Sequence, residues 1–123
     1  MIEIGSVREM LKRKNEFDYL VYICRSVRNK AEGCYVISDL APSWELFKDY
    51  RRWVEEEIWS KEMFEREYKN RFIKEMYEGV GIIRLRKMVE CSKKGMKIGL
   101  MCFCEREDMC HRSIIKEMIR EME

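Results

Sequence analysis

The near-continuous apolar run at residues 19–24, Tyr-Leu-Val-Tyr-Ile-Cys, limits the fold more than any other feature of this sequence. A strand that is apolar at successive positions is covered on both faces, as strands are in parallel sheets flanked by helices. A second apolar run follows at 98–103, and shorter ones occur at 2–4 and 34–37. Helical patterns separate these runs. We therefore expect a single-domain α/β sandwich with a small, mainly parallel sheet of about three or four strands flanked by helices.

Serine residues mark where the intervening helices begin. Ser6 and Glu9 have the spacing of a capping box, Ser43 follows the single proline Pro42, and Ser60 precedes another helical segment. The apolar residues of that segment recur at four-residue spacing, which is typical of a buried helix face. We expect this face to belong to the core and to carry Phe64, Tyr68, Phe72 and Met76.

Length and hydropathy restrict the class of protein. The 123 residues suffice for one domain with its own core, which we expect to span residues 1–123. No apolar stretch approaches the roughly 20 residues needed to cross a bilayer. The beginning of the sequence also lacks the pattern of a signal peptide. A cytoplasmic location without a membrane partner is therefore expected.

Charge and composition restrict the class of partner and the state of the cysteines. The net charge is only +2, because 25 basic residues are matched by 23 acidic ones. A nucleic-acid-binding domain usually has a strong basic excess on one face, so nucleic acid is an alternative partner that is not favoured. The sequence is rich in Lys, Arg and Glu and lacks Thr and Gln, as is typical of thermophiles. Because intracellular disulfides occur in such organisms, a pairing that involves Cys24, Cys34 or Cys91 stays open.

Residues 100–113, Leu-Met-Cys-Phe-Cys-Glu-Arg-Glu-Asp-Met-Cys-His-Arg-Ser, contain three of the six cysteines and the single histidine. The apolar run before this segment and the amphipathic pattern after it predict a strand-to-helix turn, with Cys110, His111 and Arg112 at the helix N-terminus. Open α/β sheets bind ligands at the carboxyl ends of their strands, so we expect a functional site here. Strand alternation predicts that Cys102 and Cys104 share one face, toward which Cys110 returns.

Two chemistries fit this cluster and both stay open. Cys102, Cys104, Cys110 and His111 have the ligand types of zinc, but their spacing lacks the usual repeated pairs, so zinc is the minority alternative and no cofactor is predicted. In the other interpretation, the helix dipole and Arg112 lower the pKa of Cys110, which acts as a nucleophile with His111 as acid or base. A Cys-x5-Arg phosphate cradle is excluded, because Cys110 stands where the arginine would follow Cys104.

Two motifs resemble a known family. The strand that ends Leu-Met-Cys-Phe-Cys-Glu is followed by Cys110, His111 and Arg112, and it is preceded in the chain by the segment Leu-Ala-Pro-Ser-Trp, which ends at Trp44. Over roughly residues 19–122 the sequence is similar to the domain of unknown function 488 family. That resemblance implies a single α/β domain in which the Cys-His-Arg residues line a shared cleft. The family has no established activity to carry over.

The resemblance also implies further positions in the cleft. Arg25 closes the second strand, as an arginine does in family members, and the helix N-terminus at Ser43 is expected to face the same cleft. One position departs from the family pattern: Cys104 stands where the family often has glutamate, and the carboxylate is displaced to Glu105.

We predict a cytoplasmic α/β protein whose cleft binds a small anionic ligand that is phosphate- or nucleotide-like, because arginine forks and helix N-termini recognise such groups. Cys110 and His111 supply cysteine-based chemistry if the protein is an enzyme, which the sequence leaves open together with the oligomeric state. The alternatives are a structural or interaction module with a Cys/His zinc site and a nucleic-acid-associated factor. The residues predicted to contact the ligand are Arg25, Ser43, Trp44, Cys102, Glu105 and Arg112.

Overall fold

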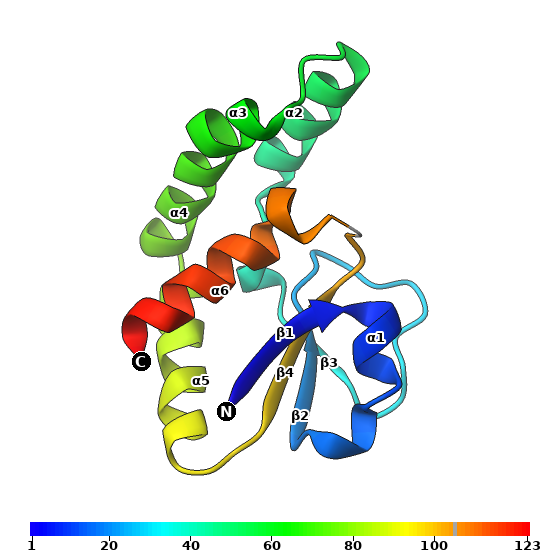
Figure 1. Cartoon of the computed structure of the whole chain (residues 1–123), viewed down its shortest axis with the longest axis vertical. Helices are drawn as coiled ribbons and strands as arrows, with labels where there is room; N and C mark the ends of the chain where they lie inside the picture. The colour runs from blue at the N-terminus through cyan, green and yellow to red at the C-terminus, as the bar shows by residue number, and fades with distance from the viewer. Residues whose placement is uncertain (105) are drawn as a thin grey trace.

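Four strands form one parallel sheet in the spatial order β1-β4-β2-β3 (Figure 1). This computed structural model describes residues 1–104 and 106–123. The strands are β1 (Ile2–Ser6), β2 (Tyr19–Tyr22), β3 (Tyr35–Val36) and β4 (Ile98–Cys102). The α-helices are α1 (Val7–Leu11), α2 (Trp44–Glu55), α3 (Lys61–Met63), α4 (Lys69–Glu78), α5 (Gly81–Lys93) and α6 (His111–Met122). Short 3-10 turns are η1 (Lys14–Glu16), η2 (Ser38–Leu40) and η4 (Glu107–Met109), and η3 (Phe64–Tyr68) is π-helical.

Strand β4 occupies the centre of the sheet, between β1 and β2. All five of its residues are buried, as the apolar run predicts. Gly99 allows α1 to approach closely, because a Cβ atom at this position would lie 2.7 Å from Leu20 Cδ1 and 3.0 Å from Met10 Cε. Strands β1 and β2 are consecutive in the sequence, yet each pairs with β4. Residues 98–102 therefore join two strands that come much earlier in the chain.

Helices cover both faces of the sheet (Figure 1). On one face α1 packs against the strands in a buried cluster of Val7, Met10, Leu20, Tyr22, Cys34 and Met101. On the other face α5 and α6 bury a larger cluster that includes Leu85, Leu100 and Ile115. The three layers confirm the predicted α/β sandwich, and every strand pairing among the described residues is parallel.

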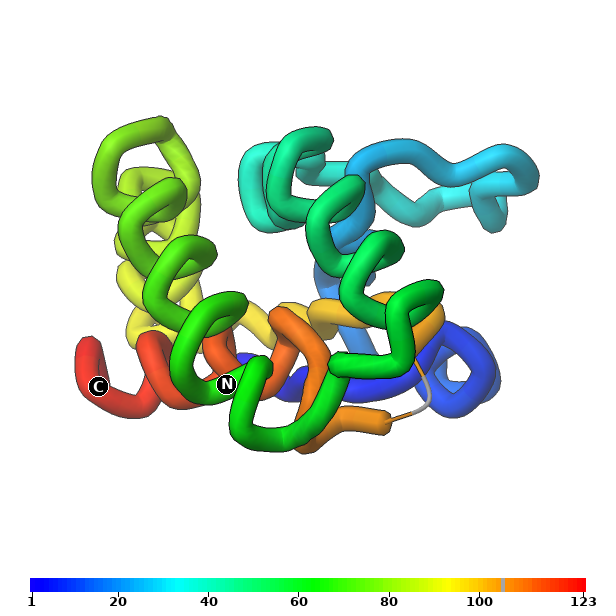
Figure 2. The backbone as a smooth tube through the Cα atoms, turned by 90° about the horizontal axis from the view of Figure 1, so that it is seen from above, coloured from blue at the N-terminus to red at the C-terminus, as the bar shows by residue number. Residues whose placement is uncertain are grey.

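Two helical arms extend beyond the carboxyl ends of the strands (Figure 1). The first arm is α2, and the second runs from α3 to α4. Figure 2 shows both arms from above. Ser43 Oγ accepts a hydrogen bond from the Leu46 amide, and Ser60 Oγ accepts one from the Met63 amide. Both predicted N-caps are thereby confirmed.

The second arm widens into a π-helical turn at η3, between α3 and α4. Phe64 and Tyr68 stack there with 5.5 Å between their ring centroids, and Tyr68 stacks in turn on Phe72. All three rings are buried, which confirms the predicted core face. Single π-helical turns inside α-helices frequently occur at functional sites.

Helix length bears on membrane insertion. Within residues 1–104 and 106–123, no helix is both long enough and apolar enough to cross a bilayer.

Candidate functional site

Three buried side chains with metal-ligand atoms meet where β4 ends and α6 begins. Cys102 is the last residue of β4, Cys110 is the N-cap of α6, and His111 is its first residue. The intervening turn brings Cys102 Sγ to 3.3 Å from Cys110 Sγ. One ligand atom from each of the three residues lies within 4.8 Å of the others. We refer to these residues together with Cys104 as the thiol-imidazole cluster.

A main-chain carbonyl fixes the position of the proton on His111. Its Nε2 atom lies 2.7 Å from the carbonyl oxygen of Ile23, just beyond β2. A carbonyl oxygen can only accept, so Nε2 carries the hydrogen and Nδ1 of the neutral ring presents a lone pair. That Nδ1 atom lies 3.5 Å from Cys110 Sγ. Burial lowers the pKa of His111, so the ring is neutral at neutral pH.

One sulfur of the cluster differs from the others in exposure and in the direction of its pKa shift. Cys104 is exposed, unlike Cys102 and Cys110, and it lines the same cavity as both. Hydrogen bonds from the Cys102 thiol and then the Cys110 thiol hold the pKa of Cys104 well below its usual range. The hydrogen bond to Cys104 raises the pKa of Cys102 to about 12. The hydrogen bond to Cys102 contributes most to a pKa of Cys110 far above the ordinary value, because a second thiolate here would face the first.

Arg112 lies directly behind the cluster. Its side chain is only 4% exposed, and its Nη1 atom lies 3.9 Å from Cys102 Sγ. Among the described residues its Nε atom has no hydrogen-bond partner. A buried guanidinium requires nearby negative charge or acceptors, and the Cys102 sulfur is one such acceptor.

The cluster forms the floor of a cavity of about 440 Å³. Its walls are mostly apolar and aromatic, and they include Trp44, Phe47, Tyr50, Tyr68, Phe103 and Met109. Arg25 also lines the cavity, and its Nε donates to the Pro42 carbonyl oxygen at 2.9 Å. Cys24 and Cys102 reach the cavity from the ends of β2 and β4, so it opens at the edge where α/β sheets bind ligands.

Burial raises the pKa values of three thiol and hydroxyl groups in the walls. It raises the pKa of the Cys24 thiol to about 11. It also raises the pKa of the Tyr50 hydroxyl and, more strongly, that of Tyr68. Arg25 and the floor are therefore the polar features of a largely apolar cavity.

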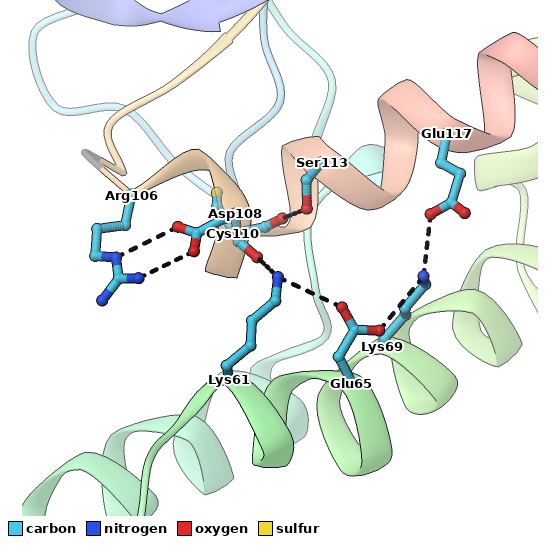
Figure 3. Close-up of polar contacts among 8 residues, drawn as sticks. All are labelled: Lys61, Glu65, Lys69, Arg106, Asp108, Cys110, Ser113 and Glu117. Atoms are coloured by element: carbon cyan, nitrogen blue, oxygen red, sulfur yellow. Dashed lines mark hydrogen bonds and ion pairs between the residues drawn. The ribbon is translucent and has the colours of Figure 1, made fainter.

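A polar network fastens the second arm to the floor (Figure 3). Lys61 Nζ on α3 donates to the main-chain oxygen of Asp108 at 2.6 Å, two residues before Cys110. On the same arm, Lys69 Nζ lies 3.0 Å from a carboxylate oxygen of Glu117 on α6. One contact lies before Cys110 and the other lies on α6, so the second arm is attached to the chain on both sides of the start of α6.

The structure brings five of the predicted site residues to this cavity: Arg25, Trp44, Cys102, Cys110 and His111. Cys104 also lines it, although β4 ends at Cys102, so Cys104 arrives from the loop and not by strand alternation as predicted. Arg112 supports the floor from behind and is not among the lining residues. Glu105 lies outside the described residues.

Ser43 does not face the cluster. Its amide nitrogen donates to Glu75 Oε1 at 2.9 Å, and its hydroxyl donates to the other oxygen of the same carboxylate. The start of α2 was expected to bind an anion of the ligand, and the structure places the Glu75 carboxylate there instead. The side chain next to it, Trp44, is the one that lines the cavity.

Several lining residues escaped the prediction from sequence. Phe47 and Tyr50 lie three and six residues after Trp44 on α2, which is the spacing of one helix face. This spacing could have predicted both as lining residues, because Trp44 was already expected at the site. Tyr68 was expected only in the core, and it serves both the core and the cavity wall. Phe103 directly follows β4, and the sequence alone does not indicate its role.

The motifs noted in the sequence agree with a comparison against known families. The family model DUF488-N3a, described as the active DUF488-N3 subclade, matches residues 7–123. The chain belongs to this subclade. No curated protein and no solved structure matches the chain. The range matched by DUF488-N3a includes the complete lining of the cavity, from Cys24 to His111.

Proposed function

We propose that this DUF488-N3a protein binds a small planar anion, of the nucleotide or phosphorylated-metabolite class, in the cavity above the thiol-imidazole cluster. The observation that carries the proposal is that a guanidinium, several aromatic rings and the cluster line one cavity. Aromatic side chains stack on planar rings, and guanidinium forks bind phosphate or carboxylate. A volume of about 440 Å³ agrees with the roughly 300–1,000 Å³ of small-molecule sites.

The exposure of the lining residues suggests how the ligand is oriented in the cavity. Trp44 and Phe103 are 55% and 60% exposed, so they offer uncovered ring surface at the mouth. Arg25 is exposed too and is positioned for the anionic group. The planar ring then extends inward, and its far edge meets the cluster at the floor.

Cysteine-based chemistry is the enzymatic form of this proposal, and the description of the subclade as active supports it. Cys110 was predicted as the nucleophile with His111 as acid or base, and the Nδ1 lone pair of His111 faces the Cys110 thiol. Cys110 is only 2% exposed, whereas Cys104 is exposed and lines the cavity. Cys104 is therefore better placed to attack a bound ligand, and Cys110 and His111 line the same cavity.

Calorimetric titration with adenosine 5′-monophosphate, adenosine and inorganic phosphate tests the proposal. We expect the monophosphate to bind more tightly than either fragment, because it engages both the rings and Arg25. Replacing Arg25 with alanine is expected to weaken monophosphate binding about tenfold to a hundredfold, as loss of a charged hydrogen bond does. Adenosine binding should change little in this variant.

Two further variants complete the test. Trp44→Ala is expected to weaken monophosphate and adenosine alike, because it removes stacking surface without removing charge. Arg86→Ala removes an exposed arginine on α5 that does not line the cavity and should leave binding unchanged. Wild-type affinities in both Arg25→Ala and Trp44→Ala would contradict the proposal, as would a failure of the monophosphate and of other nucleotides to bind.

A further inference from the structure

The thiol-imidazole cluster consists of four soft donor groups on two segments of the chain. Cys102 and Cys104 come from the end of β4 and the loop after it, and Cys110 and His111 come from the start of α6. Thiolate and imidazole are the ligands that zinc and similar soft divalent metals select. We propose that Cys102, Cys104, Cys110 and His111 together bind one such metal ion at the floor of the cavity.

The distances agree with a shared metal ion. Tetrahedral bonds of about 2.3 Å to sulfur and about 2.0 Å to nitrogen separate neighbouring ligand atoms by about 3.5–3.8 Å. The Cys102 and Cys110 sulfurs are 3.3 Å apart, and the Cys110 sulfur is 3.5 Å from His111 Nδ1. For these two pairs of atoms, shifts of a few tenths of an ångström suffice to reach that spacing. Cys104 lines the same cavity as the other three residues, and a rotation of its exposed side chain brings its sulfur to the ion as the fourth ligand.

The groups around the cluster are those that support metal ligands. A ligating histidine usually donates its second ring N–H to a carbonyl or carboxylate, and His111 Nε2 does so to Ile23. That bond leaves Nδ1, the atom that faces the sulfurs, as the ligand atom. The buried Arg112 guanidinium lies beside Cys102 and offsets thiolate charge, and the N-terminus of the twelve-residue helix α6 does the same at Cys110.

A disulfide and simple packing each explain less of the cluster than a metal ion does. A Cys102–Cys110 disulfide would use two of the donors and would leave the orientation of His111 without a purpose. Packing of small apolar thiols does not explain why the Nδ1 atom of His111 is directed at the Cys110 sulfur. The spacing in the sequence disfavoured zinc because it lacks two separated pairs, but the fold brings a Cys-x-Cys pair and a Cys-His pair together.

This inference is independent of the ligand proposed above, because metal content is measured without any organic ligand. It changes the chemistry of the floor, since a sulfur bound to a metal is not free to attack. With all four donors bound the coordination shell is closed, and the metal stabilises the turn between β4 and α6. Cys104 is the exposed ligand, so its displacement opens a coordination position toward the cavity.

The first experiment uses the wild-type chain. Protein produced in zinc-supplemented medium is analysed by mass spectrometry for metals, and reduced, chelator-treated protein is titrated with Co²⁺ without oxygen. We expect one metal ion per chain and a sulfur-to-cobalt charge-transfer band with the visible absorption of a tetrahedral site. A metal-free protein that gives no such band, while its thiols react with a disulfide reagent, would overturn the inference. A metal-free protein with a Cys102–Cys110 disulfide would overturn it equally.

Variants then assign the ligands. Cys104→Ser removes the exposed ligand, so the fold should persist while the charge-transfer band weakens and affinity for Co²⁺ falls by more than the roughly 10–100-fold typical of an outer-shell loss. Cys110→Ser and His111→Gln should lose the metal as well, with folding checked by circular dichroism. The matched control is Cys34→Ser, a buried cysteine on the other face of the sheet, which should keep the wild-type band. A Cys104→Ser spectrum identical to that of the wild type would remove Cys104 from the site.

Discussion

His111 Nε2 donates a hydrogen bond of 2.7 Å to the main-chain oxygen of Ile23, and so joins the first residue of α6 to the segment after β2. The bond fixes which ring nitrogen faces the cysteines. Phe72 packs against the same ring in an edge-on arrangement, with 5.6 Å between centroids. The orientation of the histidine thus depends on the sheet on one side and on the second helical arm on the other.

Phe72→Ala is expected to destabilise the protein by about 3–5 kcal/mol, as large-to-small core substitutions do. The side chain is 0% exposed and touches both the core and His111, so its removal leaves a cavity that the neighbours cannot fill. Urea denaturation followed by circular dichroism measures the loss. Tyr77→Ala on the same helix is the control, because Tyr77 is 55% exposed and should have little effect. Equal losses in the two variants would contradict the role of Phe72 in the core.

Stability is expected to depend on pH through Glu3. Arg13 donates two hydrogen bonds, of 2.6 and 3.0 Å, to the carboxylate of Glu3. These bonds lower the pKa of Glu3 below its usual value. A lowered pKa in the folded state stabilises the fold above the unfolded value of about 4.3, and the contribution disappears as the pH falls through the folded value. Glu3→Gln should therefore be less stable than the wild type at pH 7 and equally stable in strong acid.

Denaturant midpoints measured between neutral pH and strong acid check the Glu3 prediction. The difference at neutral pH should be small, because the pair is partly exposed and solvent screens it. Glu121→Gln, an exposed position on α6, should follow the wild-type curve across the whole range. A Glu3→Gln difference that grows toward acid would show that the sign is wrong.

Lys61→Met is expected to loosen the turn before α6 without unfolding the protein. Lys61 donates to the main-chain oxygen of Asp108 at 2.6 Å, and an exposed contact of this kind contributes at most about 1 kcal/mol. Hydrogen–deuterium exchange should become faster at residues 106–113 and stay unchanged in the central strand. Lys74→Met is the matched control, because the ion pair of this exposed lysine is with Glu78 on its own helix.

Thiol reactivity should rank by exposure. In metal-free protein, iodoacetamide is expected to modify Cys104 first, because Cys102, Cys110 and Cys34 are buried. Cys24 should react slowly at neutral pH, since burial raises its pKa to about 11. Peptide mapping of briefly treated protein measures the order, and denatured protein, in which all thiols should react, is the control. Rapid modification of Cys110 in the folded protein would contradict the buried floor described above.

Local patterns predicted most of the elements correctly. Ser43, Ser60 and Cys110 all precede helices as expected, because an N-cap depends on residues within one turn of itself. The apolar runs predicted strands for the same reason. The order of the strands was not predictable in this way, because a strand that is apolar on both faces pairs equally well with several neighbours.

At the site, too, local features were predicted and long-range contacts were not. The Cys-His-Arg segment was located from the sequence, and Arg25 and Trp44 do reach its cavity. The position of Ser43 was not predicted, because its partner Glu75 lies 32 residues later on another helix. Tyr68 reaches the cavity from a π-helical turn, and a periodicity of 3.6 residues per turn does not predict such a turn.

The central position of β4 has a consequence for the order of folding. Ile2 pairs with Ile98, so β1 has no strand partner in the described sheet until residues 98–102 have been synthesised. Contacts so distant in sequence are slow to form, and until then the edges of β1 and β2 that pair with β4 stay unpaired. The same late segment carries Cys102 and leads into Cys110, so the sheet and the cluster are completed together. A nascent chain released before residues 98–110 are synthesised would expose the unpaired edges of β1 and β2, which favours aggregation. It would also lack the floor of its cavity.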